Sequence, residues 1–281
     1  MDYIISAIPV FLLLMGMELV FSVARRKHFY RGQDTLANLS CGILSELFAA
    51  LIKGTFLLGY ATLYENVAPF HLSTHSAFAW TFAFFGVDIA YYWAHRASHR
   101  IEAAWAAHSV HHQSEEYNFS VALRQSSFQP LFTWIFFLPL AVLGLPPSLY
   151  VLSYSLNLLY QFWIHTRFIG SLGPLEWALN TPSHHRVHHG RNPKYLDKNY
   201  AGVLIIWDRF FGTFQPEEEE PLYGVTKPLG SWNPIWANFQ VWVDTARRAR
   251  EFPTLRCKLL VWIKPPGWAP DLTMPPVFSM D

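Results

Sequence analysis

The sequence predicts an all-α integral membrane protein with four to five transmembrane helices and a cytoplasmic helical cap. The chain is 52% hydrophobic, 17% aromatic and 15% charged, whereas a soluble domain has roughly 25% charged residues. Its apolar residues come in long runs, and nine of its thirteen histidines fall between residues 95 and 112 or between residues 184 and 189. The apolar runs indicate helices in a bilayer, and the histidine windows indicate the functional site.

Five apolar segments are candidates for membrane-crossing helices. A crossing needs about 20 apolar residues, and the candidates are 4–23, 38–60, 77–94, 128–143 and 148–164. The last two are short and are separated by a turn at 144–147, so we expect them to form a hairpin that either crosses the membrane or stops within it.

Basic residues orient these helices. Four of them follow the first apolar segment: Arg25, Arg26, Lys27 and Arg31. Cytoplasmic loops are enriched in Lys and Arg, and the 61–76 loop and the 144–147 turn contain neither. By alternation, segments 95–127 and 165–281 fall on the cytoplasmic side. Both histidine windows are therefore expected on the cytoplasmic face.

The histidine windows have the spacing of metal ligands. The first contains H-x3-H followed by H-x2-H-H, and the second contains H-x2-H-H again. Residues three and four apart share a helix face, so we expect each window to aim several imidazoles at one point. Imidazole binds zinc, iron and copper, and eight imidazoles are too many for one four-coordinate site. With His165, which ends the last apolar segment, the pattern predicts a two-metal centre. The candidate ligands are His95, His99, His108, His111, His112, His165, His185, His188 and His189.

Four further residues are candidates for orienting these imidazoles: Asp88, His184, Asn199 and Asp208. Asp88 lies two helical turns before His95 inside an apolar run, where a carboxylate usually has a partner. It is expected to hydrogen-bond a ligand imidazole, or to form a salt bridge with Arg96 or Arg124. His184 cannot point the same way as His185 on a helix and is expected beside the ligands or facing the substrate.

The residues alone leave the metal and the reaction open. A lipid-embedded site open to the cytoplasm suits O2-dependent oxidation of a C–H bond, which needs a redox metal such as iron. The alternatives are a desaturase on the same scaffold, a two-zinc hydrolase that activates water, and a membrane protein that only carries haem or metal. The net charge of +1 suggests no nucleic-acid partner.

The chain is expected to divide into three parts: N-terminal membrane helices at 1–76, a histidine-box domain at 77–215 and a C-terminal cytoplasmic or interfacial segment at 216–281. The last part contains a predicted helix at 233–252, with Trp236 and Phe239 on one side, and a short apolar stretch at 255–263 with basic flanks. Such segments either lie in the membrane interface or pack on the rest of the protein, and both alternatives stay open.

The three histidine boxes resemble those of the fatty acid hydroxylase/sterol desaturase superfamily. The likeness runs from about residue 80 to 215, and the stretches at 107–118, 180–192 and 197–202 are most similar to its alkylglycerol monooxygenase subgroup. Gln161 stands where other hydroxylases of the superfamily have histidine. Arg100 stands where the subgroup is expected to have glutamate.

The resemblance implies an integral membrane di-iron oxygenase that inserts oxygen from O2 into a C–H bond of a lipid, with the nine histidines as iron ligands. Zinc is a possible replacement during purification. For the ether-lipid subgroup the resemblance implies tetrahydrobiopterin as reductant, although the sequence itself does not identify the electron donor. A bacterial inner membrane is expected, because residues Met280 and Asp281 form no eukaryotic retention signal.

Overall fold

A computed structural model describes residues 3–270, and in this range the chain forms helices and no strand. The all-α prediction is therefore confirmed. Two short 3-10 helices, η1 (Trp134–Phe137) and η2 (Gly173–Trp177), complete the architecture. The α-helices, in chain order, are α1 (Tyr3–Ala24), α2 (Gly32–Asn66), α3 (Ala77–Arg100), α4 (Glu102–His112), α5 (Phe119–Ala122), α6 (Pro130–Thr133), α7 (Leu138–Val142), α8 (Pro147–Trp163), α9 (Pro182–His188), α10 (Ile206–Phe210), α11 (Pro234–Glu251) and α12 (Leu255–Ile263).

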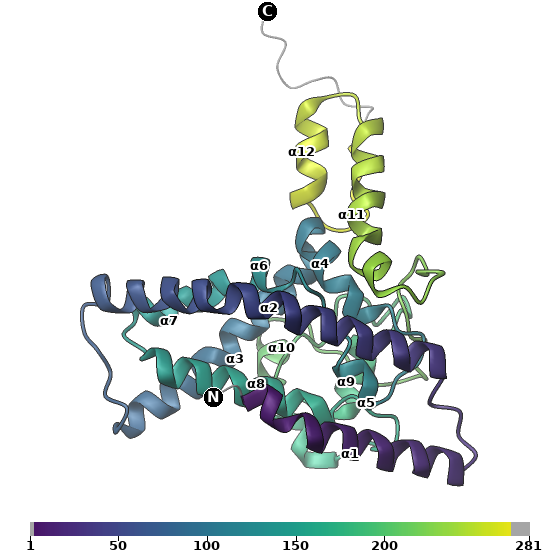
Figure 1. Cartoon of the computed structure of the whole chain (residues 1–281), viewed down its shortest axis with the longest axis horizontal. Coiled ribbons are helices and arrows are strands. Elements are labelled where there is room, and N and C mark those ends of the chain that lie inside the picture. Colours follow the sequence, from purple (N-terminus) through teal and green to yellow (C-terminus); the bar gives the residue numbers. More distant parts are fainter. Residues whose placement is uncertain (1–2, 271–281) are drawn as a thin grey trace, which may run out of the picture.

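The long helices run side by side, as Figure 1 shows for α1, α2 and α8. The broken helix from α6 to α7 follows α2 in the same direction: Phe128 contacts Phe48 at a ring distance of 5.7 Å, and Trp134 stacks on Phe56 at 5.0 Å. Pro139 at the start of α7 cannot donate a backbone hydrogen bond, which fits the interruption of this helix.

The 144–147 turn reaches the same end of the bundle as the loop after α2. The Leu72 amide donates to the Gly144 carbonyl oxygen at 2.9 Å. Gly144 has φ of +78°, and a Cβ there would collide with the Phe70 carbonyl, so the turn requires glycine. The two short apolar segments therefore form a hairpin that extends as far as the 67–76 loop.

Helix α1 is held against the bundle by one aromatic pair and one buried carboxylate. Phe11 stacks on Phe162 of α8 with ring centroids 4.0 Å apart. Glu18 accepts hydrogen bonds from the Phe119 amide and the Thr166 hydroxyl. The carboxylate thus ties α1 to α5 and to the residue that follows His165.

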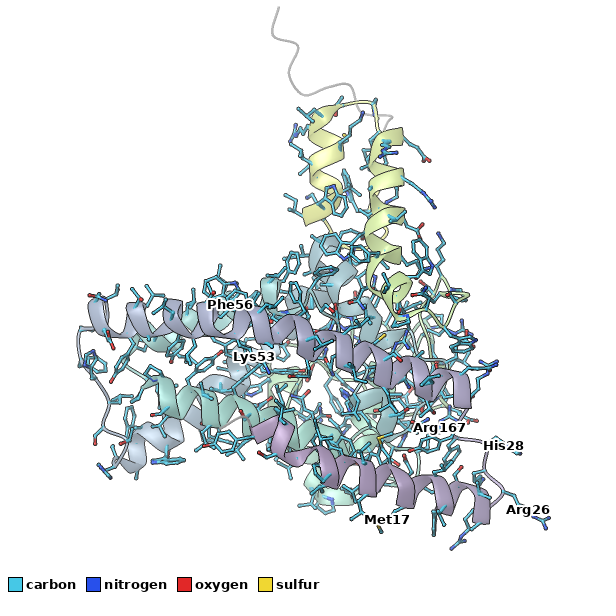
Figure 2. All side chains as sticks on the ribbon, in the orientation of Figure 1. Met17, Arg26, His28, Lys53, Phe56 and Arg167 are labelled. Atoms are coloured by element: carbon cyan, nitrogen blue, oxygen red, sulfur yellow. The ribbon has the colours of Figure 1, made fainter. Side chains whose placement is uncertain are left out.

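Two helices, α1 and α2, are long and apolar enough to cross a membrane by length and composition, and Pro130–Val142 is a shorter apolar segment. Many of their apolar side chains face outward. Met17 points away from the bundle in Figure 2, and Leu51 on α2 is exposed. Helix α3 does not pass this test, since its second half carries polar residues that include Asp88 and Ser98. Fewer helices qualify than the four or five expected.

The C-terminal helices α11 and α12 form a hairpin that projects from the body roughly perpendicular to α2 (Figure 1). Helix α11 buries Asn238, Gln240 and Thr245, whereas Phe239 on its apolar side is exposed. The apolar side identified in the sequence packs on the protein only in part, through contacts such as that between Phe239 and Phe128 at a ring distance of 5.2 Å. Residues 271–281 of the expected 216–281 segment lie outside the described residues.

Candidate metal centre

The nine candidate ligands come together as two groups of buried imidazoles. Within each group, one ring nitrogen from every histidine lies within 4.8 Å of the others. The five-histidine group consists of His95, His99, His108, His112 and His188. The four-histidine group consists of His111, His165, His185 and His189.

Each H-x2-H-H box is divided between the two groups. On α4, His108 and His112 belong to the five-histidine group and His111 to the other. On α9 and its C-cap, the members four residues apart, His185 and His189, belong to the four-histidine group. Adjacent helical residues point about 100° apart, so two consecutive histidines reach different points. Each window therefore aims at two points, not at the single point expected from the spacing.

Backbone carbonyls fix the orientation of four of these rings. In each case the histidine Nδ1 lies 2.7–3.0 Å from a carbonyl oxygen. A carbonyl oxygen only accepts, so each Nδ1 carries the proton and donates it. The pairs are His95 with Tyr200, His111 with Arg124, His165 with Gln161, and His188 with Lys198.

This protonation leaves the Nε2 atoms as bare lone pairs that face one another. Burial lowers the pKa of His111 to about 4, so its ring is neutral at pH 7. Its Nε2 lies 3.3 Å from Nε2 of His165, whose Nδ1 is also the donor. Two lone pairs at this distance repel each other and form no hydrogen bond. A cation between them would turn the repulsion into ligation.

The spacing of the nitrogens fits ligands that share one ion. Two nitrogens about 2.1 Å from an ion are about 3.0 Å apart at a right angle and about 3.4 Å apart at the tetrahedral angle. Nε2 of His95 lies 3.0 Å from Nε2 of His108, and Nε2 of His185 lies 3.0 Å from Nε2 of His165. In addition, Nε2 of His99, His188 and His189 is buried without a hydrogen-bond partner. The donor set thus fits two imidazole-bound metal ions.

The hydrogen-bond partners of Asp88 differ from those that the sequence analysis expects. Its fully buried carboxylate accepts from Asn157 Nδ2, the amides of Val203 and Leu204, and Trp207 Nε1, at 2.7–3.0 Å. No histidine, Arg96 or Arg124 contacts it through a hydrogen bond or ion pair in the described structure. Asp88 therefore joins α3 to α8 and to the 203–207 segment, and it supports the metal centre only through this packing.

The other three orienting candidates also form no hydrogen bond with a ligand imidazole in the described structure. Asp208 accepts from the Tyr200 and Ala201 amides at 2.8 Å, which holds the segment whose carbonyl orients His95. Asn199 donates to the His184 and Gln215 carbonyls. His184 belongs to neither metal group and packs against Phe214.

Gln129 was missed by sequence reasoning, and its Oε1 lies 3.1 Å from Nδ1 of His108. Asp197 follows the second histidine window and is expected from the sequence to play a part similar to Asn199 and Asp208; its Oδ1 lies 3.8 Å from Nδ1 of His99. Arg124 is fully buried and donates to the Val110 carbonyl, Asn38 and Gln113 behind α4. The carbonyls that orient the rings carry no side-chain signal. Arg124 entered the sequence analysis only as an alternative partner of Asp88.

Comparison with known proteins agrees with this geometry. The fatty acid hydroxylase family model matches residues 80–213, which include every histidine of both groups. Human alkylglycerol monooxygenase is 48% identical over 270 residues, and the alignment covers 96% of this chain and 60% of the relative. The Caenorhabditis elegans alkylglycerol monooxygenase is 36% identical, with 87% of this chain and 50% of the relative covered. The chain thus spans 50–60% of the length of these relatives.

A bacterial relative is more distant. Ornithine lipid hydroxylase OlsE of Rhizobium tropici is 30% identical over 197 residues, covering 63% of this chain and 56% of the relative. Because the relatives with 36–48% identity are eukaryotic, they contradict the expectation of a bacterial inner membrane. No solved structure matches the chain. The family model and the relatives confirm the resemblance of the histidine-box region, residues 80–213, to the fatty acid hydroxylase family.

Proposed function

We propose that this chain is a membrane-bound di-iron monooxygenase that hydroxylates a lipid, with an alkylglycerol ether as the first substrate class to test. The observation that carries the proposal is the pair of all-imidazole groups, in which neutral lone pairs face one another at 3.0–3.3 Å. Relatives named for alkylglycerol, ornithine lipid and sphingolipid oxidation support the substrate class.

Four or five membrane spans are proposed, with the metal centre at the cytoplasmic surface. His95 lies 18 residues after the start of α3, and His165 lies 18 residues after the start of α8. At 1.5 Å per residue this is roughly 27 Å, close to the thickness of the hydrocarbon core. The basic turn between α1 and α2 supports the orientation, because it lies beside the loop after α4: Arg31 pairs with Glu115 at 2.8 Å.

The histidines would hold the two irons, and the bound iron pair would supply the O2 activation that oxidation of an unactivated C–H bond requires. The residues around them have three tasks. The carbonyls of Tyr200, Lys198, Arg124 and Gln161 keep the Nε2 lone pairs free for ligation. The burial of all nine rings excludes water. The outward apolar surfaces of α1 and α2 bring the lipid phase next to the centre.

The test compares two neighbouring histidines in detergent-purified protein. The parent chain should contain about two irons and, with tetrahydrobiopterin and O2, should convert a 1-O-alkylglycerol to glycerol and a fatty aldehyde that carries label from 18O2. His185→Ala should lose iron and activity, because His185 belongs to the four-histidine group. The matched control, His184→Ala, should keep both, because His184 lies outside the groups.

Other outcomes identify the rival functions. A product lighter by two hydrogens would indicate desaturation, in line with the relative named as a sterol desaturase. Ester cleavage without O2 by protein that contains zinc would contradict the oxygenase. Turnover of the ether without added pterin, with another reductant present, would contradict tetrahydrobiopterin as the donor and leave the lipid oxidation intact.

A further inference from the structure

The C-terminal hairpin packs on the protein through a side of α11 that combines small apolar residues with three buried polar ones, Asn238, Gln240 and Thr245. Gln240 lies 3.4 Å from Gln113, the Ser127 amide donates to Asn238 at 3.0 Å, and Thr245 donates to Glu102. The outward side of α11 carries Phe239, which is 44% exposed. In a water-soluble protein the apolar side of such a helix faces the core. In α11 three polar side chains are buried while Ile235 and Phe239 are 60% and 44% exposed, which fits an outward side that meets an apolar phase.

Helix α12 also turns an apolar side outward, and the residues on that side are more exposed than Phe239. Leu255, Leu259 and Ile263 are spaced four residues apart, share one helix face and are 61–71% exposed. Arg256 and Lys258 lie on either side of this face. An apolar stripe between basic side chains is typical of a helix that lies at a membrane surface.

Aromatic contacts give the depth of the hairpin relative to the bundle. Phe239 contacts Phe128 at 5.2 Å, and Phe128 contacts Phe48 of α2 at 5.7 Å. Phe48 lies 18 residues before the end of α2 at Asn66, which is roughly 27 Å along the helix. With Asn66 at the far surface, the base of the hairpin lies near the cytoplasmic boundary of a hydrocarbon core about 30 Å thick.

Figure 1 supplies the direction. The hairpin leaves the body roughly perpendicular to α2, and α12 lies on the side of α11 that faces the far, 67–76 end of the bundle. A hairpin that starts at the boundary and runs perpendicular to the spanning helices lies in the plane of the membrane. Residues 234–264 contain six basic and two acidic side chains, a balance that complements anionic headgroups.

We propose that α11 and α12 form an in-plane hairpin that docks on the cytoplasmic leaflet of the bilayer. Leu255, Leu259 and Ile263 enter the boundary between headgroups and acyl chains, and Arg256 and Lys258 bind the phosphates of anionic lipids. The inference rests on the membrane placement made under Proposed function, and it concerns a surface outside the metal centre.

The test measures the depth of single labels on the full chain in nanodiscs of phosphatidylcholine and phosphatidylglycerol. The parent is Cys257→Ser, because Cys257 is the partly exposed cysteine and Cys41 is buried. A fluorophore is placed at Leu259→Cys on α12, at Leu47→Cys on the outer face of α2 as the lipid control, and at Glu218→Cys in the acidic turn as the aqueous control. Quenching by a lipid with a nitroxide high on its acyl chain is compared with quenching by iodide from water.

The Leu259→Cys label should be quenched by the nitroxide lipid and should lose most of the iodide quenching seen at Glu218→Cys. In the Arg256→Glu/Lys258→Glu background, a higher phosphatidylglycerol fraction should no longer increase lipid quenching at this site. If iodide reaches the Leu259→Cys label while the Leu47→Cys label is quenched by lipid, the in-plane hairpin is wrong and the membrane placement stands. If iodide reaches both labels, the membrane placement itself is wrong.

Discussion

The substitution Asp88→Asn tests whether Asp88 holds the helices together or orients a metal ligand. Each oxygen of this fully buried carboxylate accepts two hydrogen bonds: Oδ1 from Asn157 and the Val203 amide, and Oδ2 from the Leu204 amide and Trp207. An asparagine amide presents one oxygen and one NH2 group. Whichever way the amide turns, two buried N–H donors then face another donor.

The expected loss follows from these two donors. An unsatisfied buried donor costs about 1–3 kcal/mol, so Asp88→Asn should lower the free energy of unfolding by about 2–6 kcal/mol. A domain is typically stable by only 5–15 kcal/mol, and the change should lower Tm by at least about 4 °C. Iron per folded chain should stay at the parent value, because no ligand imidazole contacts Asp88.

Thermal unfolding in detergent and iron analysis of the same sample check both expectations. The matched control is Glu218→Gln in the acidic turn, the same carboxylate-to-amide change at an exposed ion pair with Lys194. Exposed pairs contribute about 0–1 kcal/mol, so this variant should melt close to the parent. An Asp88→Asn protein that melts like the parent but has lost iron would refute the reasoning and would make Asp88 a partner of a ligand.

Two further predictions concern residues behind the ligands. Arg124→Gln should lower the free energy of unfolding by about 3–5 kcal/mol, because it removes a buried cation near buried Asp34. It should also reduce iron retention, because it disturbs the carbonyl that orients His111. Unchanged chemical denaturation and iron content would contradict this. Burial opposes ionisation of Glu176, but hydrogen bonds from Ser183 and other donors outweigh burial and lower the pKa of this carboxyl group. The ionised carboxylate therefore stabilises the folded protein above pH about 4.5, and this contribution is lost as the pH falls further. Glu176→Gln should therefore flatten the dependence of Tm on pH below about 4.5, and parallel curves for the two proteins would argue against it.

Much of this arrangement could be predicted from the sequence, because helical periodicity carries the information. The H-x3-H and H-x2-H-H spacings place histidines at the ends of α3, α4 and α9, and the apolar runs predict the long helices. The division of each box between two metal groups was not predicted. It depends on the 100° between His111 and His112 and on where α9 lies relative to α4, and the second quantity is set by tertiary packing.

The hydrogen-bond partners of the polar groups could not be predicted from the sequence, for a different reason. The rings of His95 and His188 are oriented by carbonyls of Tyr200 and Lys198, and every residue offers such an oxygen. Asp88 showed that a buried carboxylate needed a partner, but three of its four donors lie 115–119 residues away along the chain. A pattern within one helix indicates that a group will be buried, and only the packing of distant segments decides what satisfies it.

Helix α4 connects the proposed metal centre with the proposed in-plane hairpin. Its first residue, Glu102, binds Thr245 and Arg248 of α11, and its amide donates to the Lys264 carbonyl just after α12. Three histidines lie on the same helix within the next ten residues. Anchoring α11 and α12 in the leaflet would therefore set the height of α4 relative to the bilayer. The two proposals are mechanically coupled: the surface that binds lipid headgroups would also fix how far the metal ligands stand from the acyl chains to be oxidised.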